Sequence, residues 1–341
     1  MKFPGKISKI SILGGGSWGT TMAILLAEKG LPVIIWEYFK ENAALMERER
    51  ENKRLLPGIK IPQSVQITDN IEEAVNDSEV LVVALPSHTV RQHMEKVSHL
   101  KTNPCAIVIL SKGLENGTFF RMSEVIEDCL GGGYREKIVT LSGPSHAEEV
   151  SRKFPTAVVV AGRDQDLLEN IQQVFGNEYF RIYTNPDQVG VELGGSLKNI
   201  IAIACGISDG LGYGDNTKAG LITRGLAEIS RFVIAHGANP VTFMGLSGLG
   251  DLVVTCTSRH SRNRRLGELI GQGNNLQEAL GKMIMVAEGV KTTKSAFDLS
   301  KKNKIDMPIT CEVYKVLYEN QSPREAVNNL LRRKQKSEIG G

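Results

Sequence analysis

Apolar and polar positions follow one another in two different ways along the chain, and the change lies near residue 187. Before it, short runs that are almost continuously apolar alternate with stretches of helical period. The clearest of these runs cover residues 80–84, 106–110, 138–141 and 157–161. Such runs are typical of strands buried on both faces, which occur in parallel sheets covered by helices. The pattern predicts an α/β domain over residues 1–187, built on a doubly wound, mostly parallel sheet.

After residue 187 the period is helical and strand signals nearly vanish. Helices are predicted over residues 189–207, 218–235, 264–270, 290–303 and 323–333, with stops at Gly237, Gly271 and Gly273. In the first part, a helix is expected over residues 165–175, and Asp69 or Asn70 is expected to cap another that runs through Ala74. We therefore expect an all-α second domain over residues 188–341.

The first apolar run leads directly into a glycine-rich turn. Gly14, Gly16 and Gly19 fit the pattern G-x-G-x-x-G between a predicted strand and a predicted helix. These glycines permit a tight turn, a close approach of backbone amides to a pyrophosphate, and close packing of the helix on its strand. An ordinary turn is the alternative, but the flanking strand and helix favour a dinucleotide site in a Rossmann-like domain.

Glu37 ends the second apolar run and suggests which dinucleotide binds. A carboxylate at this place accepts a hydrogen bond from the ribose 2'-hydroxyl and repels a 2'-phosphate. We predict a preference for NAD, with Glu37 and Tyr38 in the cofactor site. NADP remains possible, because Lys40 can offset the repulsion.

Composition excludes several classes of protein. The length of 341 residues suffices for two domains that each bury a core. The 41 basic residues nearly balance the 38 acidic ones, so no overall field attracts nucleic acid. Five widely spaced cysteines without a C-x-x-C pair exclude a zinc ribbon and argue against a disulfide framework. No metal site is expected.

The N-terminus superficially resembles a signal peptide. Lys2, Lys6 and Lys9 precede an apolar run, but the glycine turn interrupts that run. No apolar run is expected to reach the length of a membrane span. We therefore expect a first strand at this place, in a cytoplasmic protein without membrane insertion.

Small and polar residues follow the predicted strands, at the edge where open parallel sheets bind ligands. Lys112 follows the strand over 106–110, and Ser142-Gly-Pro-Ser-His-Ala follows the strand over 138–141. A surface lysine in a loop is the alternative reading of Lys112. His88 and His146 are expected to pack or to form hydrogen bonds rather than to bind metal, because no second ligand stands at a diagnostic spacing.

Gly194 and Gly195 interrupt an otherwise strong helix, at about 1 kcal/mol each relative to alanine. Such a cost fits a place where another backbone or a cofactor comes close. Lys198 lies one turn further on the same face, among apolar neighbours that would lower its pKa and suit it to proton transfer. A lysine that extends from an amphipathic helix into solvent is the alternative.

A second glycine-rich bend, at residues 245–250, ends in Asp251, which either caps a short helix or orients a catalytic lysine. Residues 258–265 then gather four arginines, which are either a solvated charge run or an anion site. Arg262 and Asn263 fall in the first turn of a helix, where the dipole disfavours a cation. An anion bound there would remove that conflict.

These segments together resemble the bacterial NAD(P)-dependent glycerol-3-phosphate dehydrogenases over essentially the whole chain. The matching segments begin at Gly14, Leu56, Ser111, Ser142, Leu193, Gly248 and Ser261. The resemblance implies hydride transfer between sn-glycerol 3-phosphate and dihydroxyacetone phosphate, which supplies phospholipid biosynthesis. It also implies a homodimer and a small phosphorylated three-carbon substrate. A related reductase of another small hydroxy acid or sugar, or a dinucleotide-sensing protein without catalysis, is the alternative.

The resemblance also implies roles for individual residues. Lys198 would transfer the proton, with support from Asp251. The residues around the substrate would be Lys112, Gly143, Ser145, Lys198, Asp251, Ser261, Arg262 and Asn263. Those along the cofactor, besides Gly14, Gly16, Gly19, Glu37 and Tyr38, would be Ser17, Trp18, Lys112, Ala147, Arg262, Val286 and Glu288.

Overall fold

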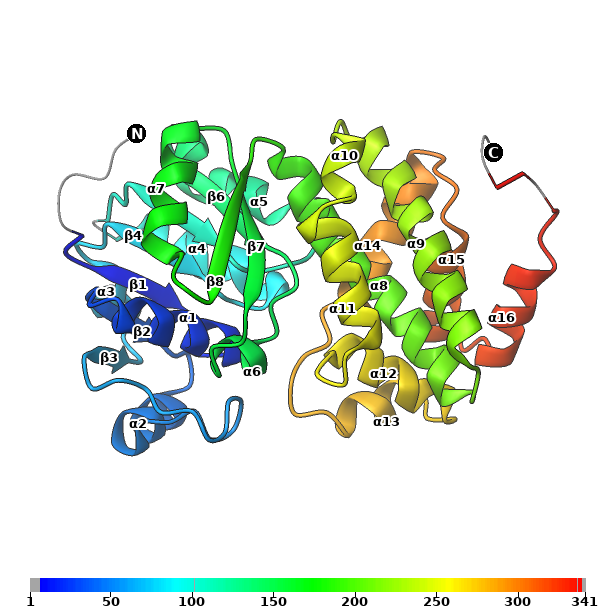
Figure 1. Ribbon diagram of the computed structural model, residues 1–341, viewed down its shortest axis with the longest axis horizontal. Helices are drawn as coiled ribbons and strands as arrows, with labels where there is room; N and C mark the ends of the chain where they lie inside the picture. The colour runs from blue at the N-terminus through cyan, green and yellow to red at the C-terminus, as the bar shows by residue number, and fades with distance from the viewer. Residues whose placement is uncertain (1–6, 101, 336, 339–341) are drawn as a thin grey trace.

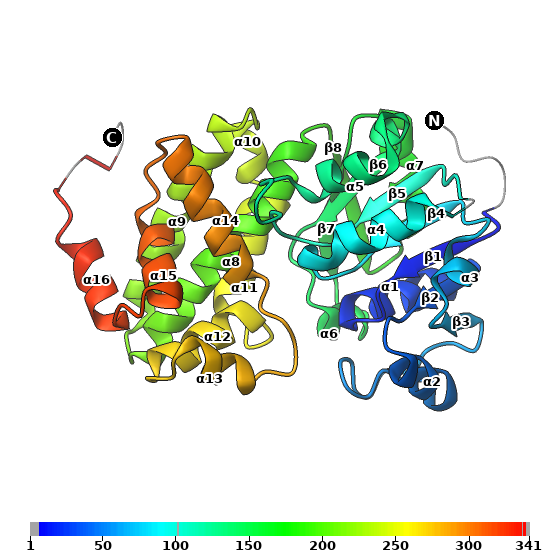
Figure 2. The same ribbon diagram turned by 180° about the vertical axis from the view of Figure 1, so that it is seen from behind.

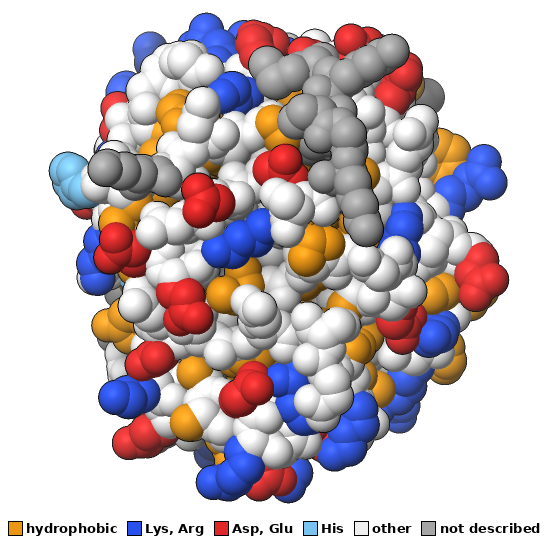
Figure 3. Space-filling view, turned by 90° about the vertical axis from the view of Figure 1, so that its left-hand side faces the viewer, with side chains coloured by type: hydrophobic (Ala, Val, Ile, Leu, Met, Phe, Trp, Pro, Cys, Tyr) orange, Lys and Arg blue, Asp and Glu red, His pale blue; other side chains and the backbone are white. Residues whose placement is uncertain are grey.

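The computed structural model describes residues 7–100, 102–335 and 337–338. The chain forms a sheet covered by helices and, beside it, a group of packed helices (Figure 1). Lys2 and Lys6 lie outside the described residues. Charged side chains of both signs are interspersed on the face of the sheet-containing part that Figure 3 shows.

Eight strands form one sheet in the order β3-β2-β1-β4-β5-β6-β7-β8. They are β1 Ile10–Leu13, β2 Val33–Trp36, β3 Val65–Thr68, β4 Val80–Val83, β5 Ala106–Ile109, β6 Ile138–Ser142, β7 Thr156–Ala161 and β8 Phe180–Asn185. All neighbouring strands are parallel except β6 and β7, which are antiparallel. The predicted doubly wound, mostly parallel sheet is thus confirmed.

Helices cover both faces of this sheet. They are α1 Ser17–Glu28, α2 Lys40–Glu49, α3 Ile71–Val75, α4 Val90–Ser98, α5 Met122–Leu130, α6 Ala147–Val150 and α7 Gln165–Phe175. Successive strand residues contribute to separate cores, with Val82 packed in the core that includes α1 and α7 and Val83 in the one that includes α4 and α5. Figure 2 shows α4 and α5 on the face opposite to α1 and α7. Burial on both faces explains why these strands are almost wholly apolar.

The second part is helical throughout its described residues. Its elements are α8 Gln188–Gly210, α9 Asp215–Ala235, α10 Pro240–Phe243, the π-turn η3 Leu246–Gly250, α11 Asp251–Thr257, α12 Arg262–Gly271, α13 Leu276–Gly281, α14 Gly289–Lys302, α15 Pro308–Tyr318 and α16 Pro323–Leu331. Helix α8 runs through the middle of this group, with α9, α11, α12 and α14 packed against it. The predicted all-α second part is confirmed.

Two stretches reach the length and mean hydropathy of a membrane span, Gln188–Gly210 and Pro240–Thr257. The expectation that no apolar run would reach this length was therefore wrong. The first stretch is α8, whose apolar window is completely buried inside the protein. A largely apolar helix that is buried on all sides is the form expected for the central helix of a helical core.

The structure also contains elements that the apolar pattern did not predict. Strands β3 and β8 mix buried with exposed residues, because they lie at the two edges of the sheet. The short helix α13 and the helix α15 were missed as well. Of the two residues proposed to cap the helix through Ala74, Asn70 does so, since its side chain accepts hydrogen bonds from the amides of Glu72 and Glu73.

Candidate active site

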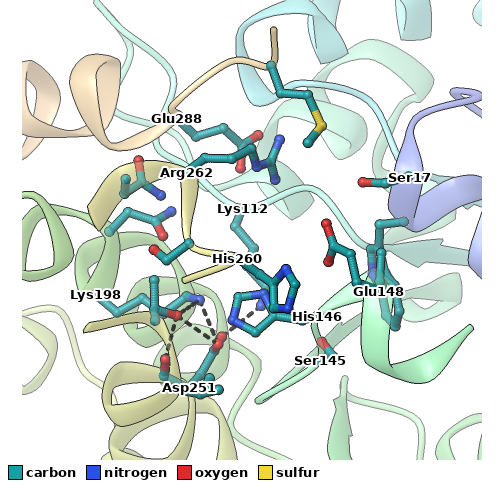
Figure 4. A pocket seen from close by; sticks show the side chains of 18 of the residues that line it. Ser17, Lys112, Ser145, His146, Glu148, Lys198, Asp251, His260, Arg262 and Glu288 are labelled. Atoms are coloured by element: carbon teal, nitrogen blue, oxygen red, sulfur yellow. Dashed lines mark hydrogen bonds and ion pairs between the residues drawn. The ribbon is translucent and has the colours of Figure 1, made fainter. Parts of the chain in front are cut away.

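A pocket lies between the sheet and the helical part, and it gathers many of the residues predicted from the sequence (Figure 4). Its lining comes from the start of α1, the loops after β5 and β6, the start of α6, helices α8 and α11, the turn that enters α12 and the segment before α14. The polar and charged residues in this lining include Ser17, Lys112, Ser145, His146, Glu148, Lys198, Asn199, Asp251, Thr255, His260, Ser261, Arg262, Asn263 and Glu288. The pocket therefore stands at the carboxyl edge of the sheet, where such folds bind ligands.

Lys198 and Asp251 form the buried centre of this pocket. The Lys198 ammonium donates to Asp251 Oδ1 at 2.6 Å and to the Thr255 hydroxyl at 2.6 Å. Lys112 donates to the other carboxylate oxygen of Asp251 at 2.7 Å. One carboxylate thus binds two ammonium groups. The alternatives of Lys112 as a surface lysine and of Lys198 as a lysine that extends into solvent are therefore wrong.

Glycines in α8 make this arrangement possible. A Cβ on Gly195 would lie 2.8 Å from the Ser142 hydroxyl, and one on Gly194 would lie 2.9 Å from the ring of Phe243. The two glycines therefore allow α8 to approach the end of β6 and helix α10. The sequence predicted that another backbone or a cofactor comes close to α8 at Gly194 and Gly195. At both glycines the nearest atoms belong to protein side chains.

Close contacts around a further glycine, Gly248, fix the position of Asp251. In the π-turn before it, a Cβ on Gly248 would lie 1.9 Å from the carbonyl oxygen of Phe243, so only glycine fits. Asp251 is the first residue of α11, and its carboxylate is directed at the lysines (Figure 4). No side chain caps α11. The alternative of Asp251 as a capping residue is therefore wrong.

Burial changes the proton affinity of this group of residues. It lowers the pKa of Lys198 to about 8, although the neighbouring Asp251 carboxylate acts in the opposite direction. Burial alone would raise the pKa of Asp251, but Lys112 and Lys198 hold it below its ordinary value. Lys198 can therefore gain or lose a proton near physiological pH beside a carboxylate that stays ionised.

The turn into α12 presents a guanidinium to the pocket. Ser261 caps the helix by accepting a hydrogen bond from the Arg264 amide at 3.2 Å, and Asn263 Oδ1 accepts one from the Gly289 amide at 2.9 Å. Arg262, between them, lies close to the half-buried carboxylate of Glu288 (Figure 4). A cation and a helix N-terminus together form a favourable place for an anion.

The glycine turn at the start of α1 has the geometry that a dinucleotide requires. Gly14 has φ of +113°, and a Cβ on Gly19 would lie 2.0 Å from the carbonyl oxygen of Gly14. A Cβ on Gly16 would meet nothing within 4 Å, so space is open above the amides at the helix start. No side chain caps α1. These residues therefore fit a pyrophosphate group.

Asn52 supports this turn, and sequence reasoning missed it. Its side-chain amide donates to the Gly15 carbonyl oxygen at 2.7 Å and to the Thr20 hydroxyl at 3.2 Å. The segment that carries Asn52 follows α2 and comes into contact only through the tertiary fold. A polar residue in a loop gives no local signal of this role.

Glu37 lies against the same turn but outside the pocket. Its carboxylate accepts a hydrogen bond from the Phe39 amide at 3.0 Å. Burial raises its pKa, while that amide, Asn42, Gly15 and the charge of Arg54 oppose the change. Arg54 is therefore a cation near Glu37 that the sequence did not reveal.

Similarity to known proteins agrees with this geometry. Models described as the N-terminus and the C-terminus of NAD-dependent glycerol-3-phosphate dehydrogenase match residues 9–168 and 187–328. A Thermoanaerobacter protein named glycerol-3-phosphate dehydrogenase [NAD(P)+] is 53% identical, over 98% of this chain and 99% of its own. The chain belongs to this family. A Chlorobium phaeobacteroides relative of the same name is 50% identical over 97% of this chain and 99% of its own.

Solved structures of the family share the architecture. The crystal structure of glycerol-3-phosphate dehydrogenase from Coxiella burnetii has a TM-score of 0.92 and 38% identity, and the match covers 97% of this chain and all of that one. The described residues hold no group of three or more His, Cys, Asp or Glu side chains that could bind a metal ion.

The pocket does not include every residue that the family resemblance suggested. Gly14, Gly16, Gly19, Glu37, Tyr38 and Val286 are not part of its lining. The glycines and Glu37 belong to the adjoining turn, and half-exposed Tyr38 stands edge-on to Trp36. Val286 is exposed outside the lining, and its neighbour Met285 lines the pocket. Residues that sequence reasoning did not assign include Glu148, Asn199, Thr255 and His260.

Proposed function

We propose that this protein interconverts sn-glycerol 3-phosphate and dihydroxyacetone phosphate by hydride transfer with NAD(H) or NADP(H). The observation that carries the proposal is the Lys198 ammonium, held by Asp251 and Thr255 in a pocket shared with Arg262 and adjoining the glycine turn. Family membership supports the same reaction. The product, sn-glycerol 3-phosphate, would supply the backbone of phospholipids.

The proposed cofactor site lies along the start of α1 and the facing loops. The residues proposed to hold the dinucleotide are Gly14, Gly16, Ser17, Trp18, Gly19, Glu37, Tyr38, Lys112, Ala147, Arg262, Val286 and Glu288. The nicotinamide ring supplies or accepts the hydride when bound. The open amides at Gly16 support placement of the pyrophosphate at the start of α1.

Lys198 is proposed to transfer the proton that accompanies the hydride. During ketone reduction, its protonated amine would donate to the oxygen that becomes the hydroxyl group. During alcohol oxidation, its neutral amine would accept that proton. Asp251 would keep the amine oriented and stabilise its charged form. The pKa of about 8 supports both directions.

The remaining polar residues are proposed to bind and orient the substrate. Arg262 and the start of α12, with Ser261 and Asn263, would hold the phosphate group. Lys112, Gly143 and Ser145 would line the three-carbon part. Fixing the distant phosphate aligns the reacting carbon and so converts binding energy into rate.

An absorbance assay of reduced nicotinamide with dihydroxyacetone phosphate tests the proposed function directly. We expect consumption of the cofactor that depends on enzyme and on the phosphorylated ketone. Dihydroxyacetone without phosphate should react far more slowly, because it lacks the group that Arg262 binds. No turnover with either cofactor would instead favour a dinucleotide-sensing protein.

The titration of Lys198 predicts opposite pH profiles for the two directions. Oxidation of glycerol 3-phosphate needs the neutral amine, so its kcat/KM should rise about tenfold per pH unit below about pH 8 and then level off. Reduction needs the protonated amine and should fall above about pH 8. Initial rates from about pH 6.5 to about pH 9.5 measure both profiles. Parallel profiles would contradict the role of Lys198.

Glu37 is proposed to make NAD(H) the preferred cofactor. We expect a higher kcat/KM with NADH than with NADPH, because the Glu37 carboxylate repels a 2'-phosphate. Glu37→Gln should shift the ratio toward NADPH by about tenfold, or about 1.4 kcal/mol. Glu41→Gln is the matched control, because Glu41 is exposed in the first turn of α2. A wild-type preference for NADPH would show that Arg54 or Lys40 outweighs Glu37.

We also propose a division at residue 187, with a dinucleotide-binding domain over 1–187 and a substrate-binding domain over 188–341. The separate apolar cores of the two parts support this division. We propose further that the protein is a homodimer and that it is located in the cytoplasm. Exposed apolar side chains at the end of α9 and in α10, Ile234 and Val241, support an interface between two copies.

A further inference from the structure

Two imidazoles face each other across the crevice between the two parts of the protein. His146 comes from the loop between β6 and α6, and His260 from the turn between α11 and α12. Their ring centroids are 5.8 Å apart and the rings are tilted by 53°. Both line the pocket that holds Lys198 and Asp251 (Figure 4). The function proposed above assigns neither of them a role.

His146 has an unmet hydrogen-bonding capacity in this position. It precedes α6 without capping it, and its Nε2 atom is buried and has no hydrogen-bond partner. A buried polar nitrogen without a partner is unfavourable unless a ligand or a movement provides one. The expectation that His146 packs or forms hydrogen bonds is met by its packing against His260, while its Nε2 atom keeps an unmet hydrogen-bonding capacity.

The charges around His146 are mixed. Burial lowers its pKa, and the Lys198 ammonium acts in the same direction. The carboxylates of Glu148, Asp251 and Glu149 act in the opposite direction. His146 is thus expected to be neutral near physiological pH in the free protein, with carboxylates close enough to support its charged form.

The charged groups of the pocket balance one another before any ligand enters. The cations in its lining are Lys112, Lys198 and Arg262, and the carboxylates are Glu148, Asp251 and Glu288. A phosphate monoester brings a charge of about −1.5 to −2 into this neutral surrounding. The added negative charge favours the uptake of a proton by any imidazole in the pocket. Among its described lining residues, the imidazoles are those of His146 and His260.

We propose that His146 and His260 are further substrate-binding residues, which approach the phosphorylated substrate from the two sides of the crevice, and that His146 takes up a proton as the substrate binds. This inference rests on the proposed function. Binding of the substrate would raise the proton affinity of His146, so binding would be tightest at low pH. Affinity would weaken as the pH rises through the pKa of the bound state.

Titration calorimetry on a non-reacting complex tests this inference. The full chain is saturated with NADH and titrated with glycerol 3-phosphate, so that both ligands are reduced and no hydride can move. At about pH 7.5, the phosphate group is already a dianion, since its second pKa is about 6. Titrations in two buffers with different enthalpies of ionisation then give the number of protons taken up on binding.

We expect proton uptake in the wild type and a smaller uptake in the double variant His146→Gln/His260→Gln, because Lys198, with a pKa of about 8, still takes up part of a proton. The double variant should bind glycerol 3-phosphate about tenfold more weakly at about pH 6.5 and almost equally at about pH 9. Its KM for dihydroxyacetone phosphate should rise in the same way, with kcat at saturating substrate little changed. The variant His99→Gln, at an exposed position beyond α4, should behave as the wild type.

The outcomes separate this inference from the proposed function. Equal proton uptake and equal pH dependence in the wild type and the double variant would overturn the inference. Failure of the wild type to bind glycerol 3-phosphate at all would overturn the proposed function instead. Thermal unfolding and NADH affinity, measured on the double variant, show that its fold and its cofactor site are intact.

Discussion

Replacing Lys198 with methionine is expected to lower kcat in both directions by about a thousandfold or more. General acid–base catalysis by a positioned group contributes about 10²–10⁴-fold, and methionine has no proton to transfer. The fold should survive, because Asp251 keeps its ion pair with Lys112 at 2.7 Å. Steady-state assays with each substrate measure the loss. Fluorescence titration with NADH should show nearly unchanged cofactor affinity.

The variant Lys198→Arg separates charge from proton transfer. A guanidinium keeps the positive charge beside Asp251 but does not lose its proton in proteins. We expect Lys198→Arg to remain almost as inactive as Lys198→Met in the oxidation of glycerol 3-phosphate. Near-normal turnover in either variant would remove Lys198 from the chemical step.

Asp251→Asn is expected to lower both activity and stability, because one carboxylate holds two ammonium groups. Its removal leaves Lys112 and Lys198 side by side with no charged partner between them. Breaking such a buried pair typically costs about 3–5 kcal/mol of unfolding free energy. The pKa of Lys198 should fall below 8, because the Asp251 carboxylate raises this pKa in the wild type and is absent from the variant. The rise in oxidation rate with pH should then occur at a lower pH.

Asp209→Asn provides a matched control for this prediction. Asp209 lies near the end of α8 and, like Asp251, binds two cations, Lys218 at 2.8 Å and Arg264 at 2.7 Å, but it is not part of the pocket lining. Urea unfolding should show lower stability in both variants. The pH profile of oxidation should move only in Asp251→Asn. The same movement in Asp209→Asn would mean that general destabilisation, rather than the loss of the carboxylate beside Lys198, causes the effect.

Several features of the fold were predictable because neighbouring residues in the sequence encode them. Strands buried on both faces gave continuous apolar runs, and the helix over 165–175 was predicted with the bounds that the structure has. The edge strands β3 and β8 were missed, because each exposes part of its length and therefore interrupts the apolar pattern. The antiparallel direction of β7 has no signal in apolar runs, since a strand buried on both faces is equally apolar in either direction.

The candidate site was predictable to a smaller degree. The glycine turn and the glycines before Lys198 stand out in the sequence, because glycine in a strand–helix turn or inside a helix needs a structural reason. Lys112 and Asp251 were assigned to the site from their positions after a strand and a glycine-rich bend and from the family resemblance. Their shared ion pair joins residues 139 positions apart. No local pattern indicates such a contact.

By itself, the sequence determined the two-part architecture, the glycine turn at the start of α1 and the helix on which Lys198 stands. These features depend on the order of apolar residues and glycines over a few turns or one strand. Only the tertiary structure decided that Asp251 binds both lysines, that Asn52 supports the glycine turn and that His146 meets His260. The physical reason is that a buried charge or imidazole obtains its proton affinity from the groups packed around it. Those groups come from elements that are distant in the chain.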